Sequence, residues 1–245
     1  MTPRITVATA VRVFWQLRRD PRTIALLLVV PPVLMTLLRY ILNGQSGTFN
    51  RIAAPMLGMF PFIIMFLVTS ITMLRERTSG TLERLMTTPL GKLDLLLGYG
   101  IAFGTMGVAQ STVASLVAFG LLDVHTQASA GLVILLAAGN AVLGMALGLF
   151  VSAFARSEFQ AVQFMPAMVF PQMLLSGLFV PRDDMARALQ WLADVLPLTY
   201  AYDALARVEA SGSFDSRVAR DLAVTIGVTL LALALGALTL RRRTA

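Results

Sequence analysis

Residues 52–74 of this chain read IAAPMLGMFPFIIMFLVTSITML, without one charged side chain. A helix needs about 20 mostly apolar residues to cross the hydrocarbon core of a bilayer, because each residue advances it by only about 1.5 Å. Backbone polar groups inside a bilayer must pair with one another, so a run of this length predicts a helix. We therefore predict that residues 52–74 span a membrane.

The rest of the chain contains further runs of the same kind. They cover residues 23–42, 95–122, 124–155, 159–181 and 222–240, with Arg39 the only charged residue among them. The composition agrees, since apolar residues make up 57% and charged residues 13%, against roughly 45–50% and about 25% in soluble domains. We predict an all-α integral membrane protein with six transmembrane helices, forming a single transmembrane domain over residues 1–245.

An amphipathic helix is predicted over residues 5–19, lying in the membrane interface. Its polar face holds Thr9, Arg12, Gln16 and Arg19, and its apolar face holds Val7, Val11, Phe14 and Trp15. Such a pattern is typical of helices whose apolar face dips below the headgroups. Arg18 falls on the apolar side, so its side chain would have to reach back toward the interface. Asp20-Pro21 is expected to end this helix before the first span.

The fifth run departs from a plain spanning helix. Pro166 and Pro171 lie inside it and predict a kinked element that ends near Ser176-Gly177. Residues 182–221 follow, and we predict that they form an outer segment before the last span. A short amphipathic helix is expected within this segment, because apolar residues recur there at helical spacing. They are Met185, Leu189, Leu192 and Leu196.

Arginine and lysine are distributed unevenly between the loops. If both termini lie in the cytoplasm, the inner segments hold most of the basic residues, and the outer segments hold a slight excess of acids. Because positive residues favour the cytoplasmic side, we predict a multi-pass protein of the inner (cytoplasmic) cell membrane with both termini inside. The net charge of +7 is then a topology signal, and we do not expect nucleic acid as a partner.

Sites for catalysis are not apparent in the sequence. The chain has no cysteine and one histidine, His125, which excludes thiolate metal sites and cysteine nucleophiles. A phosphate-binding loop of the G-x-x-x-x-G-K-[ST] type is also missing. Its nearest match, Gly91-Lys92, has Met86 where the first glycine belongs and Leu93 where the hydroxyl belongs. We therefore predict that this chain is not an enzyme and holds no cofactor.

Polar and small residues inside the runs have two interpretations. Gln110, Asn140, Gln163 and Gln172 are either interhelical hydrogen-bonding groups or a polar lining for a transported cargo. The spacings Gly107/Ser111/Ser115 and Gly144/Gly148 favour close packing of helix backbones.

The loop over residues 75–93 carries the most informative pattern in the chain. Gly80 is expected to break the helix that leaves the membrane, and residues 81–86 can form a short helix that ends before Pro89. Gly91 and Asp94 resemble a weak capping pair at the start of the next run. On composition alone this segment would be an ordinary charged inner loop.

A resemblance to a known family changes this interpretation. The loop is similar to the coupling-loop signature of the ABC-2 type exporter permeases, especially their drug-resistance branch. The matching residues are Glu76, Gly80-Thr81-Leu82-Glu83, Leu85 and Thr88-Pro89, followed later by Leu175-Ser176-Gly177, Phe179, Pro181, Trp191 and Pro197-Leu198-Thr199-Tyr200. Two positions depart from the pattern, since Gly91 stands where the family often has serine and Tyr99 where a lysine is common.

This resemblance implies a transport subunit that works with partners. The chain would pair with a second copy or a similar permease, and each copy would bind a separate ATPase subunit that carries ATP and magnesium. The implied coupling residues are Glu76, Gly80, Thr81, Glu83, Leu85 and Pro89, and Arg12, Phe14, Trp15 and Arg19 are the implied residues of the interfacial helix. Glu76 and Glu83 would make polar contacts to the ATPase, and Leu85 an apolar one.

The implied cargo is hydrophobic or amphipathic, either drug-like or lipid-like, and it moves outward. Two other classes stay open: a lipid-modifying enzyme within the membrane, and an ATP-independent channel or carrier. Both predict activity without an ATPase partner.

Overall fold

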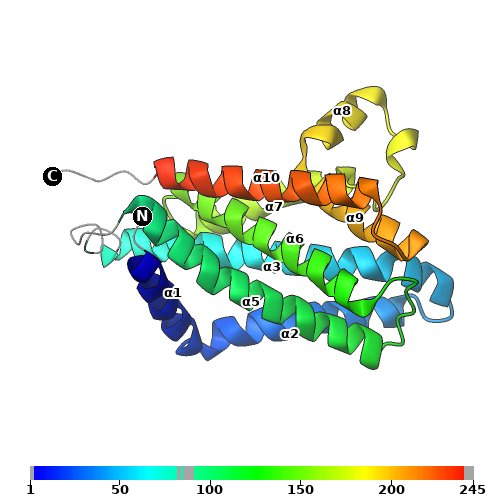
Figure 1. Ribbon diagram of the computed structural model, residues 1–245, viewed down its shortest axis with the longest axis horizontal. Helices are drawn as coiled ribbons and strands as arrows, with labels where there is room; N and C mark the ends of the chain where they lie inside the picture. The colour runs from blue at the N-terminus through cyan, green and yellow to red at the C-terminus, as the bar shows by residue number, and fades with distance from the viewer. Residues whose placement is uncertain (1–2, 82–83, 85–90, 240–245) are drawn as a thin grey trace.

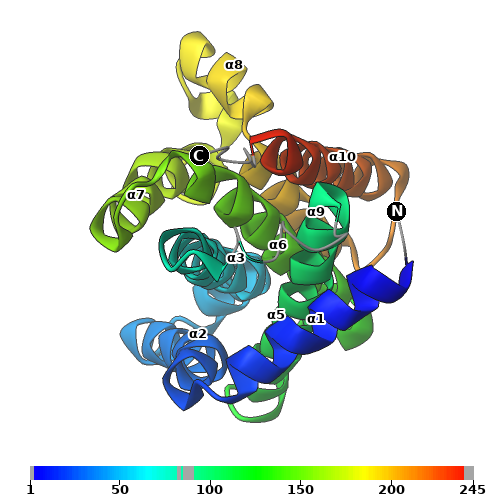
Figure 2. The same cartoon turned by 90° about the vertical axis from the view of Figure 1, so that its left-hand side faces the viewer.

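The computed structural model describes residues 3–81, 84 and 91–239, and every regular element within them is helical (Figure 1). The elements are α1 (Pro3–Arg18), α2 (Pro21–Ile41), α3 (Ser46–Thr78), α5 (Lys92–Gly120), α6 (Ala130–Val151), η1 (Ser152–Phe154), α7 (Glu158–Leu175), η2 (Arg182–Asp184), α8 (Arg187–Val195), α9 (Pro197–Ser211) and α10 (Ser216–Thr239). The long helices run side by side along the long axis. Helix α1 instead crosses one end of the bundle, over α5 (Figure 2).

Within the described ranges, five helices are long and apolar enough to cross a membrane. They are Pro21–Ile41, Ser46–Thr78, Lys92–Gly120, Ala130–Phe154 and Ser216–Thr239. The prediction of long apolar helices is therefore confirmed for five of the six runs.

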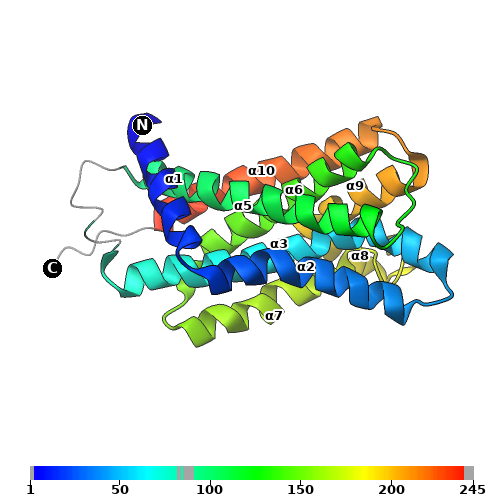
Figure 3. The same ribbon diagram turned by 90° about the horizontal axis from the view of Figure 1, so that it is seen from below.

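The fifth run, residues 159–181, gives a helix that ends next to Ser176-Gly177, as the sequence predicts. Helix α7 has 18 residues, contains Pro166 and Pro171, and ends at Leu175. It is not among the five candidate spans, because three glutamines and two prolines dilute its apolar residues. It nevertheless packs along α3 and runs parallel to the bundle axis (Figure 3). Its crossing of the membrane stays a prediction.

Helix α3 lies at the centre of the bundle and packs most extensively against α6. A Cβ atom added at Gly144 would overlap the backbone of Phe62, and one added at Gly148 would overlap the carbonyl oxygen of Phe66. The Thr69 hydroxyl lies 3.2 Å from the Met145 carbonyl oxygen across this interface. The close packing predicted from the glycine spacing is confirmed here, because only residues without a side chain allow the two backbones to approach this closely.

Several helix ends fall where the sequence predicts them. Asp20 caps α2, and hydrogen bonds from the Thr23 hydroxyl and backbone N–H hold the pKa of its carboxyl below the usual value. Helix α3 ends at Thr78, and Gly80 follows with a φ of +72°. Glycine reaches this left-handed conformation at little cost, which confirms Gly80 as the helix breaker.

The outer segment, residues 182–221, differs from its prediction. Its short amphipathic helix is present as α8, which projects from the bundle (Figure 1). A second helix, α9, was not predicted. It returns into the bundle, packs against α10, α3 and α6, and buries Leu198, Leu205 and Val208 completely. The segment is therefore partly core and not only a surface structure.

Candidate functional site

Glu76, at the start of the loop over residues 75–93, links helix α1 to α3. Glu76 is only 8% exposed, and its carboxylate lies 3.6 Å from the Arg12 guanidinium. Gln16 donates a hydrogen bond of 3.1 Å to the same Glu76 oxygen. Arg12 also donates to the Tyr99 hydroxyl of α5 at 2.8 Å. These four side chains, here called the α1 clamp, join three helices at one end of the bundle.

A second set of contacts holds α1 against α5. The Thr6 hydroxyl donates to Asp94 at 3.0 Å, and both side chains are buried. A Cβ atom added at Gly98 would overlap the side chain of Thr9, so the two helices touch closely where they cross. The side of α1 that faces the protein is mixed, with Thr6, Thr9, Val13 and Leu17 buried, whereas Val7, Phe14 and Trp15 point outward.

The structure places the predicted coupling residues in three groups. Glu76 lies in the α1 clamp, and Gly80 and Thr81 follow the end of α3. The remaining predicted coupling residues, Glu83, Leu85 and Pro89, lie outside the described residues. A role of any of them in contacting an ATPase stays a prediction.

The predicted residues of the interfacial helix differ in burial. Arg12 is half-buried in the clamp, whereas Phe14, Trp15 and Arg19 are exposed. Two members of the site were not recognised from the sequence. Tyr99 stood out only because the related family often has lysine nearby, and Asp94 only as a possible helix cap. Neither pattern reveals a contact to a helix more than eighty residues earlier in the chain.

The four polar residues proposed for a cargo route do not share one environment. Asn140 donates to the Ala201 carbonyl at 3.4 Å, and Gln172 accepts from the Leu198 backbone N–H at 3.4 Å. Both therefore attach α9 to its neighbours, as the hydrogen-bonding interpretation predicts. Gln163 is exposed on α7, while Gln110 is fully buried and has no hydrogen-bond partner in the described part of the chain.

An ionic network lies at the opposite end of the bundle, around α9. Arg182 pairs with Asp203 of α9 at 2.7 Å and also with Asp194 of α8. The fully buried Asp221 of α10 pairs with Arg220 at 2.8 Å and lies 3.7 Å from Arg207 of α9. Burial raises the pKa of the Asp203 carboxyl, and the nearby Arg182 charge partly opposes this effect. The network joins η2, α8, α9 and α10.

We expect Arg182→Ala to loosen this outer network. Breaking a buried ion pair costs about 3–5 kcal/mol, but Arg182 is partly exposed, so a loss of about 1–2 kcal/mol in unfolding free energy is expected. Thermal unfolding in detergent measures this loss, and limited proteolysis measures cleavage around α8. Arg187→Ala is the matched control, since Arg187 is exposed and outside the network. Equal stability and cleavage of the two variants would contradict the prediction.

Within residues 3–81, 84 and 91–239, no three His, Cys, Asp or Glu side chains come together as a metal site would require.

Comparison with known proteins finds similarity to ABC transporters. Residues 6–210 match the ABC-2 type transporter family. The ABC transporter G family member 20 of Dictyostelium discoideum is 27% identical over 170 residues, covering 69% of this chain and 23% of that protein. The probable multidrug ABC transporter permease YbhS of Escherichia coli K12 is 24% identical over 183 residues, covering 74% of this chain and 48% of that protein.

A third relative is named for resistance to linearmycin. The linearmycin resistance permease protein LnrN of Bacillus subtilis is 25% identical over 142 residues, covering 58% of this chain and 37% of that protein. The chain thus matches about half or less of the length of these relatives.

Proposed function

Because the chain belongs to the ABC-2 type transporter family and is a multi-pass membrane protein, we propose that it is the membrane-spanning permease subunit of an ATP-binding cassette exporter. ATP would be hydrolysed on a separate nucleotide-binding subunit, which would carry the ATP and magnesium. This chain would supply the membrane passage and the surface that receives the movement of that subunit.

The α1 clamp is the observation that carries this proposal. Arg12, Glu76 and Tyr99 join α1, α3 and α5 at the end of the bundle where the loop over residues 75–93 begins. A force applied to this loop would act on α3 and α5 directly and on α1 through the clamp. Packed side chains and ion pairs of this kind can carry coupling between distant sites. Glu76 would then transmit movement between helices instead of touching the ATPase itself.

The proposed arrangement in the membrane rests on the positions of α7 and α1. We place α7 as the sixth crossing, because it runs along α3 within the bundle. Both termini would lie in the cytoplasm, and α1 would lie in the inner interface of the cell membrane. The outward apolar face of α1 supports this placement, since Val7 is 57% and Trp15 51% exposed.

A second copy of this chain, or a similar permease, would complete the passage. Exposed apolar side chains along α7, among them Phe159, Phe170 and Leu174, leave a face for a partner. The cargo would be a drug-like or lipid-like amphiphile moved outward. Two relatives are named for multidrug transport and linearmycin resistance, which supports this class of cargo.

Reversing the charge of Glu83 tests the proposal. The chain is purified from membranes with its nucleotide-binding subunit, and ATP hydrolysis of the complex is measured. We expect Glu83→Arg to lower recovery of that subunit, or the coupled hydrolysis, by about tenfold, which corresponds to about 1.4 kcal/mol of contact energy. Asp183→Arg is the control, because Asp183 is exposed and lies in η2, which packs against α8 and not beside the loop over residues 75–93, so both quantities should stay unchanged.

One result would contradict the permease assignment, and another would contradict only the role of Glu83. If the chain purifies alone and is active alone, the enzyme or channel alternatives take its place. If the nucleotide-binding subunit is recovered equally with both variants and hydrolysis is also equal, Glu83 does not belong to the coupling surface.

A further inference from the structure

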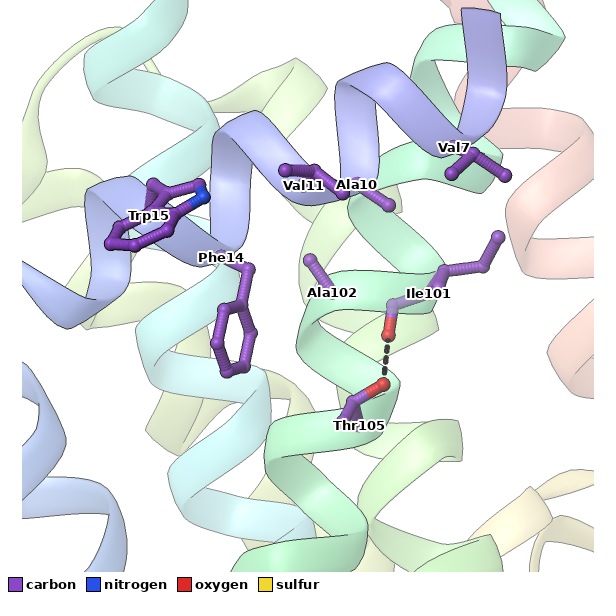
Figure 4. Close-up of a pocket in the computed structure, with 8 residues that line it drawn as sticks. All are labelled: Val7, Ala10, Val11, Phe14, Trp15, Ile101, Ala102 and Thr105. Atoms are coloured by element: carbon purple, nitrogen blue, oxygen red, sulfur yellow. Dashed lines mark hydrogen bonds between the residues drawn. The ribbon is translucent and has the colours of Figure 1, made fainter. Parts of the chain in front are cut away.

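An apolar groove lies in the corner where α1 crosses α5. Its walls include Val11, Phe14 and Trp15 of α1 and Ile101, Ala102 and Thr105 of α5, and its volume is about 380 Å³. This size falls within the range of about 300–1,000 Å³ typical of small-molecule sites. Figure 4 shows Phe14 extending from α1 alongside α5, so that the groove continues down α5 away from α1.

The walls of this groove suit a hydrocarbon chain. The hydroxyl of Thr105 donates to the carbonyl oxygen of Ile101 in its own helix at 2.8 Å, so it offers no free donor to a ligand. The other polar group is the indole N–H of Trp15, at the α1 end. A ligand inside the groove would therefore meet apolar surface along its length and polar groups only at the level of α1.

The α1 end of the groove is positively charged. Arg18 holds its guanidinium 5.2 Å from the centre of the Trp15 ring, in the geometry of a cation–π contact. Helix α1 contains no acidic residue, and the described residues place no carboxylate within ion-pair distance of Arg18. Arg12, in contrast, is already occupied by Glu76. Arg18 is thus an exposed cation held beside the mouth of an apolar groove.

We propose that the α1–α5 groove binds one anionic phospholipid of the surrounding bilayer. An acyl chain occupies the corner along Phe14 and Thr105, and the phosphate lies against Arg18. A guanidinium matches phosphate oxygens with paired hydrogen bonds, and basic residues near the cytoplasmic leaflet attract anionic lipids. The bound lipid would fill the space between α1 and α5 that protein side chains leave open.

This inference rests on the membrane placement in the proposed function but not on transport. The test therefore uses the full chain purified in detergent, without any ATPase partner. Native mass spectrometry measures the dissociation constants of phosphatidylglycerol and phosphatidylethanolamine with identical acyl chains. We expect phosphatidylglycerol to bind roughly fivefold more tightly, in line with the attraction of one arginine for an anionic lipid surface.

Two pairs of variants separate the headgroup from the chain. Arg18→Gln should reduce the fivefold preference to nearly none, whereas Arg156→Gln, an exposed arginine outside the groove, should keep it. Thr105→Trp should weaken binding of both lipids about tenfold by filling the corner, whereas Leu116→Trp, exposed on the same helix, should not. Thermal unfolding of each variant confirms that the bundle is intact, and the changed side chains are all exposed.

Three results would overturn the proposal. Equal binding of both lipids by the unaltered chain would remove the anionic headgroup from the assignment. Binding that Thr105→Trp leaves unchanged would place the lipid elsewhere. Displacement of the lipid by an amphiphilic cargo, such as a drug-like cation, would assign the groove to the transport path. None of these results bears on the co-purification with the ATPase, so failure of either proposal can be recognised separately.

Discussion

Gly144→Ala should lower the free energy of unfolding by about 3 kcal/mol, at the upper end of the usual cost of overpacking. The added methyl group would overlap the backbone of Phe62 in α3, including its carbonyl oxygen. A flexible side chain could rotate away, but backbone within a packed helix cannot. Helices α3 and α6 would have to separate, and their interface is the most extensive in the bundle. Thermal unfolding of the detergent-purified chain measures the effect.

Gly139→Ala is the matched control for this prediction. Gly139 lies in the same helix, but an added Cβ atom would meet nothing within 4 Å. Alanine favours the helix over glycine by about 0.5–1 kcal/mol, so this variant should be neutral or slightly more stable. The two substitutions are chemically identical, so a difference in stability between the two variants reports the packing around each glycine. Equal unfolding temperatures for both variants would show that α3 and α6 pack less closely than the structure indicates.

The spans were predictable because membrane helices carry a strong local signal. Residues 52–74 and 222–240 show it directly, since length and hydropathy alone separate a span from a soluble segment. The glycine pair in α6 was predictable for a related reason, because its spacing already defines one face of a helix. Both predictions depend only on residues that are near one another in the chain.

Helix α9 could not be predicted in the same way. Its buried positions, such as Leu198 and Leu205, alternate with Asp203, Arg207 and Glu209, which lower its hydropathy to that of a surface segment. These charges are accommodated because Asp203 pairs with Arg182, and Arg207 lies near Asp221. The partners come from other elements, so the sequence of α9 alone does not show that its charges can be buried.

The orientation of α1 at the candidate site also depends on contacts that its own sequence does not reveal. The sequence predicts exposed apolar side chains such as Val7 and Trp15, but it does not show that Val13 and Leu17 are buried against the bundle. Gln16 and Glu76 are 60 residues apart, and no local pattern links them. Thr9 and Val13 are both buried on the side that packs on α5, while Arg19 of the predicted polar face is exposed.

Glu76→Arg should detach α1 from the bundle and, under the proposed function, uncouple this chain from the proposed ATPase subunit. The new cation would lie beside Arg12 in a site where Glu76 is only 8% exposed. Breaking a buried pair costs about 3–5 kcal/mol, and the partial exposure of Arg12 reduces the expected cost to about 2–3 kcal/mol. Because the chain has no cysteine, a spin label on Ala8→Cys reports the mobility of α1 without interference. We expect a mobile label and a loss of coupled ATP hydrolysis of at least about tenfold.

Combining Glu76→Arg with Arg12→Glu should restore much of the docking, because the pair then has opposite charges again. The Tyr99 hydroxyl, which accepts from Arg12 at 2.8 Å, can equally donate to a carboxylate at that position. Arg19→Glu is the control, since Arg19 is exposed and its reversal should leave the label immobile. If the double variant stays as mobile as Glu76→Arg, the charge pair does not hold α1. If docking returns but coupled hydrolysis does not, Glu76 contacts the ATPase directly, as the family resemblance first implied.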